Sequence, residues 1–485
     1  MRLRRFLPAS VTARLVLAAL ALSALGACTV GTPYVRPDAP TPPAYKEAAG
    51  WVPAEPADAL ERGAWWTLFG DAELDRLESK VEVSNQNVAA AVANYAQARA
   101  LVRVDQAALF PTLGATAGAS RSGGGGGSGG VSRSGNSLQA GLDASWAPDV
   151  WGRLRLAVSG AEASAQASEA DLAAATLSAQ ALLATDYFAL READAEEALL
   201  RRTVAGYERA VTITQNSYDA GISAKTDLLQ AQTTLENARA TLVGLTHQRA
   251  QLEHAIAVLV GLPPADFRID VAPWVMNVPT VPPGVPSTLL QRRPDIAAAE
   301  RAVAAANAQI GIQRSAYFPS LSLSGSFGFA SSTASRLFSA PSSLWSVGLS
   351  VAQTIFDAGA TRARVEGAEA ARDAAVAQYR QTVLAAFQNV EDQLSASRTL
   401  EAQEGSRRRA SAAADLVEQQ LLNQYRAGQV GYTSVVTAQA SALSARQTLV
   451  QLVSSRQASA VALIQALGGG WHVPQAFEGA ASTPQ

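Results

Sequence analysis

The hydrophobic and polar positions of this chain follow two different periods, one typical of helices and one typical of strands. Two long stretches, 153–218 and 362–425, contain no proline and little glycine. At ~1.5 Å per residue, each would form a helix about 100 Å long. Shorter helices are expected on either side of them, near 71–109, 225–260, 288–316 and 433–467.

Apolar residues in the expected helices recur at the spacing of a coiled coil. The clearest stripe falls in 225–260 and consists of Leu228, Leu235, Leu242, Leu245, Leu252, Ile256 and Leu259. Such a stripe forms a seam between packed helices. Plain helix packing explains the pattern, and a ring of such helices would make the wall of a tube.

Four other segments alternate strictly between apolar residues and small polar ones, at the length and period of tilted membrane strands. A soluble hairpin with one face on a core is the alternative, although the polar positions are nearly all Ser or Gly. The apolar positions are Leu113, Ala115, Ala117 and Ala119; Leu138, Ala140, Leu142, Ala144 and Trp146; Leu321, Leu323, Phe327 and Phe329; and Trp345, Val347, Leu349 and Val351.

These strands form two hairpins, at about 112–147 and about 320–352. The glycine-rich tract 123–130 between the first two strands lacks a phosphate-binding ending, so it is expected to be a flexible exposed loop. Four strands cannot close a barrel, and an open edge in lipid leaves backbone groups unsatisfied. Any membrane barrel would therefore be shared between subunits.

The chain contains a long internal duplication. Residues 218–261 align with 425–468 at a constant offset of 207 and without gaps, and 15 of the 44 positions are identical. Phe110-Pro111 recurs at Phe318-Pro319, one residue out of register. The duplicated unit is far longer than a solenoid repeat, so each half is expected to build the same structure.

The N-terminus has the pattern of an export signal. Arginines precede a short apolar run that ends at Leu25-Gly26-Ala27-Cys28, and Cys28 is the only cysteine. This sequence resembles the lipobox of bacterial lipoproteins, which implies cleavage before Cys28 and acylation there by palmitate or a similar chain. Thr29 in place of Asp favours the outer membrane.

Composition excludes several classes of function. Loss of residues 1–27 removes four arginines and no acids, which changes the formal net charge from −2 to −6. A nucleic-acid partner would require a basic face. The three histidines, His247, His254 and His472, form no metal-binding pattern, and no nucleophile motif occurs. We therefore expect no enzyme activity, no metal and no cofactor apart from the lipid.

The sequence divides at its proline-rich stretches. We expect a signal peptide at 1–27, a lipidated tether and equatorial segment at 28–70, and a first repeat at 71–270. These are followed by a proline-rich linker at 271–287, a second repeat at 288–470 and a C-terminal tail at 471–485.

Taken in order, these features resemble an outer-membrane factor of tripartite efflux pumps, the TolC/OprM-like family, in its lipoprotein (NodT) branch. The lipobox, the segment 65–71 (Trp-Trp-Thr-Leu-Phe-Gly-Asp), the paired Phe-Pro sites, the duplicated Tyr-x-Ala-Gly turns and Trp471 carry the resemblance. It implies a mixed α and β membrane protein, a homotrimer whose subunits each give four strands to a 12-stranded transmembrane β-barrel. A long α-helical periplasmic barrel would join it.

The resemblance also implies a function and partners. The trimer would be the exit duct of an RND-type pump that confers resistance to antibiotics or other toxic solutes. A periplasmic adaptor (membrane fusion protein) and an inner-membrane RND transporter would supply the solutes. A duct for type I protein secretion and a structural periplasmic lipoprotein are the alternatives.

Under this resemblance the two turns between long and short helices are the periplasmic tips. Ala220, Gly221, Ala427 and Gly428 would dock the adaptor, although capping alone explains both glycines. The candidate gate consists of Asp227, Tyr218, Tyr425, Val435, Val436 and Thr437. Asp227 is the candidate charged gate residue, or else an ordinary acid at a helix start.

Overall fold

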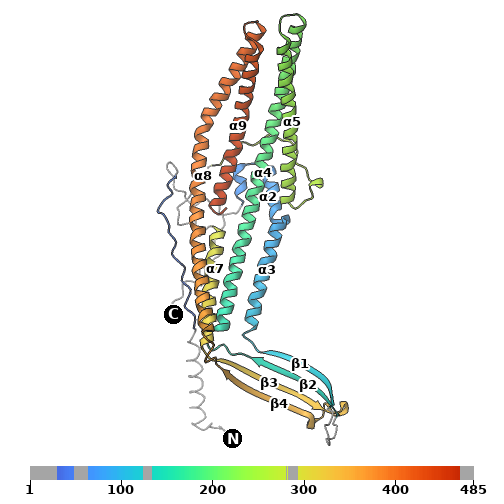
Figure 1. Cartoon of the computed structure of the whole chain (residues 1–485), viewed down its shortest axis with the longest axis vertical. Coiled ribbons are helices and arrows are strands. Elements are labelled where there is room, and N and C mark those ends of the chain that lie inside the picture. The colour runs from blue at the N-terminus through green and yellow to red at the C-terminus, as the bar shows by residue number, and fades with distance from the viewer. Residues whose placement is uncertain (1–29, 48–63, 124–133, 280, 282–292, 470–485) are drawn as a thin grey trace, which may run out of the picture. The chain divides into compact units, whose positions relative to one another are not determined.

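The computed structural model of the chain describes residues 30–47, 64–123, 134–279, 281 and 293–469 (Figure 1). Cys28, the leader and Trp471 lie outside the described residues. Within them, none of the helices combines the length and the apolar character that crossing a bilayer requires.

Long helices dominate the described residues. They are α2 (Ala72–Ser84), α3 (Gln86–Ala107), α4 (Arg153–Asp219), α5 (Lys225–Leu259), α7 (Pro294–Arg314), α8 (Ala360–Arg426) and α9 (Tyr432–Ala466). Helices α4 and α8 both have 67 residues, and α5 and α9 both have 35. The duplication is therefore present in the structure as two pairs of helices of matched length.

Single turns of 3-10 helix connect some of these elements. They are η2 (Trp65–Phe69), η3 (Pro264–Asp266), η4 (Ser315–Tyr317), η5 (Ala334–Arg336) and η6 (Ala340–Ser342). In η2, Trp65 and Phe69 are almost completely buried, and Phe69 packs against Phe188 with ring centroids 4.9 Å apart.

The strands form one antiparallel sheet in the order β1 (Thr112–Gly123), β2 (Ser134–Trp146), β3 (Ser320–Ser331) and β4 (Ser343–Ala352) (Figure 1). Each repeat supplies one hairpin, and β2 pairs with β3 to join them. The predicted class, long helices with four strands per chain in two repeats, is confirmed.

The expected single helix over 71–109 is wrong, because it breaks at Asn85 into α2 and α3. The Asn85 side-chain oxygen accepts hydrogen bonds from the backbone N–H of Asn87 (2.9 Å) and Val88 (3.1 Å) and so caps α3. Its amide nitrogen donates to the Leu259 carbonyl at 2.8 Å. Gly261 contacts this break: a Cβ there would lie 2.1 Å from the Ser84 carbonyl oxygen.

The chain folds into two compact units, and each unit draws residues from both repeats. The first comprises the described parts of 1–38, 95–168 and 299–379, and includes all four strands. The second comprises the described parts of 39–94, 169–298 and 380–485, and includes α2, α5 and α9. The duplicated halves are thus not separately folded domains, and the boundaries drawn between the repeats stay predictions.

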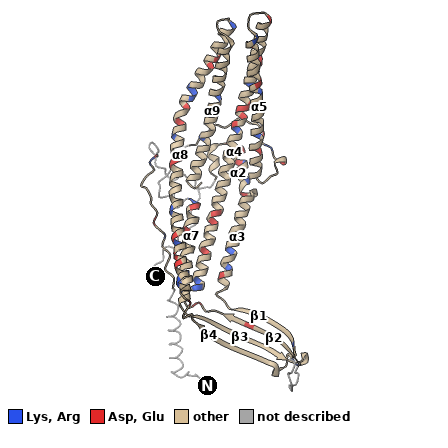
Figure 2. Ribbon diagram, in the orientation of Figure 1, with Lys and Arg blue, Asp and Glu red and all other residues tan. Residues whose placement is uncertain are grey.

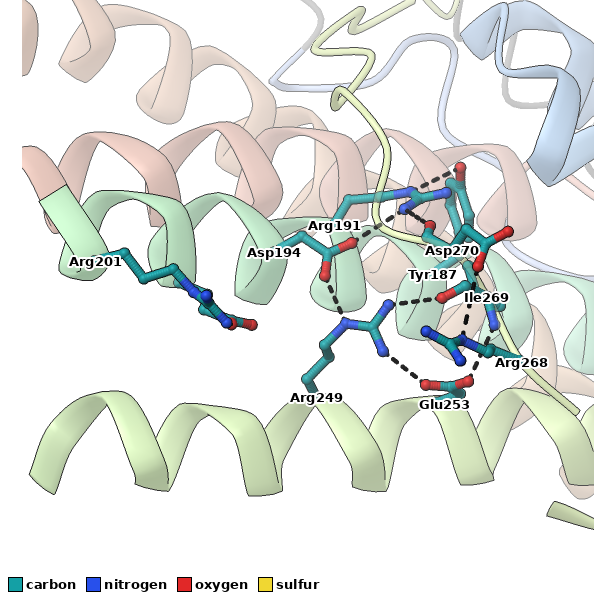
Figure 3. A network of polar contacts seen from close by, with 10 residues as sticks. Tyr187, Arg191, Asp194, Arg201, Arg249, Glu253, Arg268, Ile269 and Asp270 are labelled. Atoms are coloured by element: carbon teal, nitrogen blue, oxygen red, sulfur yellow. Dashed lines mark hydrogen bonds and ion pairs between the residues drawn. The ribbon is translucent and has the colours of Figure 1, made fainter. Parts of the chain in front are cut away.

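A buried ionic network in the second unit fixes the segment that follows α5 (Figure 3). Asp194 accepts from Arg191 at 3.0 Å and from Arg249 at 2.6 Å. Arg191 also donates to the Asp270 carbonyl at 2.9 Å, and Arg249 donates to the Ile269 carbonyl at 2.7 Å. Both arginines thus hold backbone carbonyls of this segment against α4 and α5.

The second repeat places an arginine at the position equivalent to Arg191. Arg398, at the same offset of 207, pairs with Glu47. The backbone N–H groups of Lys46 and Glu47 donate to the Glu391 carboxylate at 2.7 and 2.8 Å. The two related arginines thus bind two different surface segments.

Glu78 on α2 is a completely buried acid. Its relative exposure is 0% and, among the described residues, neither carboxylate oxygen has a hydrogen-bond partner. Burial, and then the nearby Asp75 and Glu82, raises the pKa of Glu78 from 4.5 to about 9. Glu78 is therefore neutral at physiological pH.

We predict that Glu78→Gln stabilises the fold at pH 7. The pKa of Glu78 is higher in the folded state than in the unfolded state. Its contribution to the free energy of unfolding is therefore fully present below pH 4.5, and it is lost as the pH rises toward 9. The gain at pH 7 is at most about 3 kcal/mol, at ~1.36 kcal/mol per pH unit. Chemical denaturation between pH 5 and 9 measures it. Exposed Glu236→Gln is the control, and a gain independent of pH would contradict the prediction.

Candidate functional site: the sheet and the helix tips

One face of the sheet is apolar over the middle of the strands, because the strand register aligns the apolar positions, while Arg121 and Asn136 lie on this face toward the β1–β2 loop. Leu142 lies opposite Ala115 on β1 and Phe327 on β3, and Phe327 lies opposite Trp345 on β4. The same alignment runs along the strands, with Leu323 opposite Leu349. Many of these side chains are exposed in the single chain: Trp345 is 77% and Leu349 is 66% exposed. Such an apolar surface needs a cover other than water.

The opposite face is polar and built mainly from small side chains. Hydroxyl groups pair across the strands, as between Ser322 and Ser350 (2.7 Å) and between Ser326 and Ser346 (2.9 Å). Among the described strand residues, Asp143 is the only charged side chain on this face, and it accepts from Thr116 at 3.0 Å. Figure 2 shows how sparse charge is on the strands compared with the helices. This two-faced pattern is that of a transmembrane strand with lipid on one side and a watery lumen on the other.

Both outer strands of the sheet lack a neighbour within the described chain. In the order β1-β2-β3-β4, β1 and β4 each have a strand on one side only. In lipid, each unsatisfied N–H or C=O group would cost several kcal/mol. The four described strands are therefore part of a larger sheet if the apolar face contacts lipid.

Tryptophans anchor the ends of the sheet to the helical connections. Trp146 Nε1 donates to the Leu109 carbonyl at 2.9 Å, and Trp151 Nε1 donates to the Pro319 carbonyl at 2.6 Å. Trp151 also stacks on Phe318 with centroids 4.9 Å apart. Tryptophan with a satisfied N–H is typical of the membrane interface.

The N-terminal segment lies at the same corner. The N–H of Val30 donates to the Trp151 carbonyl at 3.3 Å, and Asn307 Nδ2 donates to the Thr32 carbonyl at 3.1 Å. Gly31 lies close to α7, since a Cβ on Gly311 would be 3.0 Å from the Gly31 Cα.

The two helix tips have the same backbone structure. Gly221 (φ 71°) and Gly428 (φ 73°) adopt the left-handed conformation, and no heavy atom lies within 4 Å of a Cβ built on either glycine. Their N–H groups donate to the carbonyls of Tyr218 and Tyr425, both at 2.9 Å. Ala220 and Ala427 donate to the carbonyls four residues earlier, both at 3.1 Å.

Aromatic and aliphatic side chains of α4, α5, α8 and α9 pack beneath the tips. Tyr425 packs edge-on against Tyr432 with centroids 5.2 Å apart, and Val436 is partly buried beside them. Tyr432 is almost completely buried. Burial, followed by Tyr425, Tyr207 and Asp227, raises its pKa to about 12. Tyr432 was not among the residues predicted at the tips, although it starts α9 and stands where the first repeat has Lys225.

The expectation that Val435 lines a constriction is wrong. Val435 is 0% exposed and packs against Ala210, Ala231 and Tyr432 inside its own subunit. It aligns with Leu228, which is also buried, so this repeated position belongs to the core. Val435 can only support other residues at the tip.

The remaining gate candidates are accessible to different degrees. Asp227 lies in the first turn of α5 and is half-buried, and no side chain caps that helix. Tyr218 is 38% exposed. Thr437 is exposed, and its hydroxyl donates to the Thr433 carbonyl of its own helix at 3.0 Å.

A sheet with one apolar and one polar face, together with paired long helices in two repeats, defines a class of outer-membrane channel. The family described as Outer membrane efflux protein matches residues 77–262 and 285–469. The chain belongs to this family. It is an outer-membrane channel of an efflux pump, a transport protein and not an enzyme.

Relatives match almost the whole chain. The probable efflux pump outer membrane protein TtgC of Pseudomonas putida is 32% identical, over 92% of this chain and 94% of its own. The cation efflux system protein CusC of Escherichia coli is 31% identical, over 92% of this chain and 97% of its own. The solved structure of the outer-membrane channel OprN is 31% identical with a TM-score of 0.83, over 92% of this chain and 100% of its own. The solved structure of the Campylobacter jejuni CmeC outer membrane channel has a TM-score of 0.84, over 94% of this chain and 98% of its own. At 23% identity this likeness supports the fold alone.

We predict opposite outcomes for charges placed on the two faces of β4. Leu349→Arg puts a guanidinium on the apolar face and should cost about 2–4 kcal/mol in lipid. Ser350→Arg puts the same group on the polar face and should be tolerated. The effect of each substitution is measured as the amount of folded protein in the outer membrane. Equal amounts of the two variants would contradict the assignment of the faces.

Proposed function

We propose that three copies of this chain form a passive exit duct of a tripartite RND-type pump, anchored in the outer membrane by lipid on Cys28. The observation that carries the proposal is the sheet of four described strands, in which the outer edges of β1 and β4 have no partner strand. If β4 of one copy pairs with β1 of the next, three copies give twelve strands. A heterologous contact of this kind closes a ring and leaves no edge exposed to lipid.

The exposed apolar residues of α3 favour the same assembly. Val92, Leu101 and Val104 are each at least half exposed in the single chain. They lie on α3, whose first turn includes Val88, a residue that is buried within its own subunit. A neighbouring subunit that covers this helix would remove the apolar surface from water.

The two tips support docking of a periplasmic adaptor, with an inner-membrane RND transporter feeding the duct. Gly221 and Gly428 leave open space above identical turns, so one kind of adaptor element could bind each subunit twice. Relatives are named for efflux of antibiotics, of toluene and of cations. We infer that small toxic solutes are the class conducted here, with selection made by the transporter.

The proposed duct is tested by restoring efflux. A cell that lacks its own outer-membrane channel, supplied with this chain and its matching adaptor and transporter, should regain export of a small toxic solute. No gain in export, despite normal insertion, would overturn the proposal. The same assay without the transporter is the control.

We predict that Cys28→Ala abolishes lipid attachment. Two or more acyl chains, at about 0.8 kcal/mol per buried methylene, give a stable anchor, whereas the variant has only its strands. Labelling with radioactive palmitate measures attachment. Unchanged labelling of Cys28→Ala would show that the acyl chain is attached elsewhere and would contradict the prediction.

Asp227 remains the proposed charged gate residue, and Tyr218, Tyr425, Val436 and Thr437 the side chains around it. We predict that Asp227→Ala makes cells several-fold more sensitive to large antibiotics, since three carboxylates would leave the constriction. Asp219→Ala, in the exposed end of α4, is the matched control. Equal sensitivity of both variants would make Asp227 an ordinary first-turn acid.

A further inference from the structure

Glycine occurs at the same position in the two 67-residue helices. Gly160 on α4 and Gly367 on α8 are related by the offset of 207, and both lie in the first unit. Glycine in the interior of a helix is unfavourable, because it loses more backbone entropy on folding than any other residue. Each glycine lies two turns inside its helix, so helix capping explains neither of them.

Within the chain, Gly160 permits close contact between α4 and α7. A Cβ built on Gly160 would lie 3.4 Å from the Ala308 Cβ and 3.9 Å from the Ala305 carbonyl oxygen. One turn earlier on α4, Leu156 occupies the space that Gly311 leaves on α7, since a Cβ on Gly311 would be 2.6 Å from Leu156 Cδ1. Small residues thus allow these two helices to approach each other.

The hairpin registers define which residues of the two repeats correspond. Thr112 on β1 and Ser320 on β3 differ by 208, and the residues opposite them, Ser145 and Ala352, differ by 207. The elements before the first turn of each hairpin, α3 with β1 and α7 with β3, therefore correspond at an offset of 208. The elements after it, β2 with α4 and β4 with α8, correspond at 207.

Gly367 has no close neighbour within its own chain. Among the described residues, no heavy atom lies within 4 Å of a Cβ built on Gly367. The counterpart of Ala308 is Ala100 on α3. Whereas Ala308 is buried, Leu101 and Val104 beside Ala100 are more than half exposed. Both halves of the contact made by Gly160 are therefore present again in the chain, but they do not meet there.

We propose that Gly367 of one copy lies against Ala100 of the next copy, so that α8 packs on the neighbour's α3 as α4 packs on α7 within the chain. The contact rests on the proposed trimer. Within the chain, β2 pairs with β3 and α4 contacts α7. The equivalent step between copies pairs β4 with the neighbour's β1 and brings α8 to the neighbour's α3. It also covers the exposed apolar residues of α3.

Side-chain sizes are complementary in this contact. Leu156 and Gly311 form a pair in which the large side chain comes from the long helix. Their counterparts are Ala363 on α8 and Arg103 on α3, so the large side chain comes from the short helix instead. Each pair combines one large and one small residue, which close packing between helices requires.

The same correspondence gives a register for the strands that would meet. Leu142 on β2 lies opposite Phe327 on β3. Their counterparts are Leu349 on β4 and Ala119 on β1, and both belong to the apolar face of the sheet. A shift of one residue would place an apolar-face residue opposite a polar-face residue. The agreement of the faces therefore supports the transfer of contacts from one repeat to the other.

Paired cysteines in the full chain, oxidised in outer membranes, test the contact. Gly367→Cys with Ala100→Cys should give covalent trimers, since the equivalent Cβ positions within the chain are 3.4 Å apart, close to the ~3.8 Å of a disulfide. Gly367→Cys with Gln106→Cys is the control and should give none. The counterpart of Gln106 is Arg314, which pairs with Glu369 of its own repeat.

Substitutions of two sizes at Gly367 give a second measurement. Alanine and leucine both favour a helix over glycine, and the Cβ of either has open space within the single chain. Gly367→Ala should keep the trimer. Gly367→Leu should lower the fraction of trimer about tenfold, because the larger side chain overpacks the contact with the neighbour's α3. Size-exclusion chromatography in mild detergent measures this fraction.

The mass of the wild-type chain in mild detergent, measured by light scattering, separates this contact from the trimer itself. A trimeric mass together with no disulfide between positions 367 and 100 would overturn the contact and leave the proposed duct standing. Equal linking in the Gln106→Cys control, or equal trimer in Gly367→Leu and Gly367→Ala, would do the same. A monomeric wild-type chain would overturn both proposals.

Discussion

The sheet is shaped by the hydrogen bonds that the outer edges of β1 and β4 cannot make within one chain. A strand edge in water can bond to solvent, but in lipid each unpaired backbone group costs several kcal/mol. The sheet has an apolar face that suits lipid and two such edges among its described strands. A single subunit is therefore unsuited to the bilayer, and pairing between subunits is the direct remedy. The proposed assembly would follow from backbone chemistry before any side-chain contact between subunits is considered.

The duplication explains why the helices match and where the repeats diverge. Helices α4 and α8 have equal length, and the two tip turns share their hydrogen bonds. Arg191 and Arg398 occupy equivalent positions, yet one holds the Asp270 carbonyl and the other pairs with Glu47. Each repeat thus uses the same arginine to fasten a different surface segment. Helix geometry is kept between the halves, whereas the outer contacts have changed.

Much of the fold could be predicted from the sequence, because helix length and strand alternation are local properties. The helices at 153–218 and 362–425 and the two hairpins are examples. The break at Asn85 was missed because an N-cap without proline or glycine looks like any polar helix residue, and only the Leu259 carbonyl completes its environment. Val435 was misplaced at the gate because burial depends on contacts from other helices.

Disulfide bonds between the strand edges of neighbouring copies would show directly whether β4 of one copy pairs with β1 of the next. Cys28 is the only natural cysteine, and its thiol is blocked if it is acylated, so new cysteines on β1 and β4 can be oxidised cleanly. A set of paired positions on the two strands, scanned one register at a time in outer membranes, should yield covalent trimers at the paired register. No larger ladder should form, because the proposed trimer would close the ring. Folded, membrane-inserted monomers at every register would contradict the account.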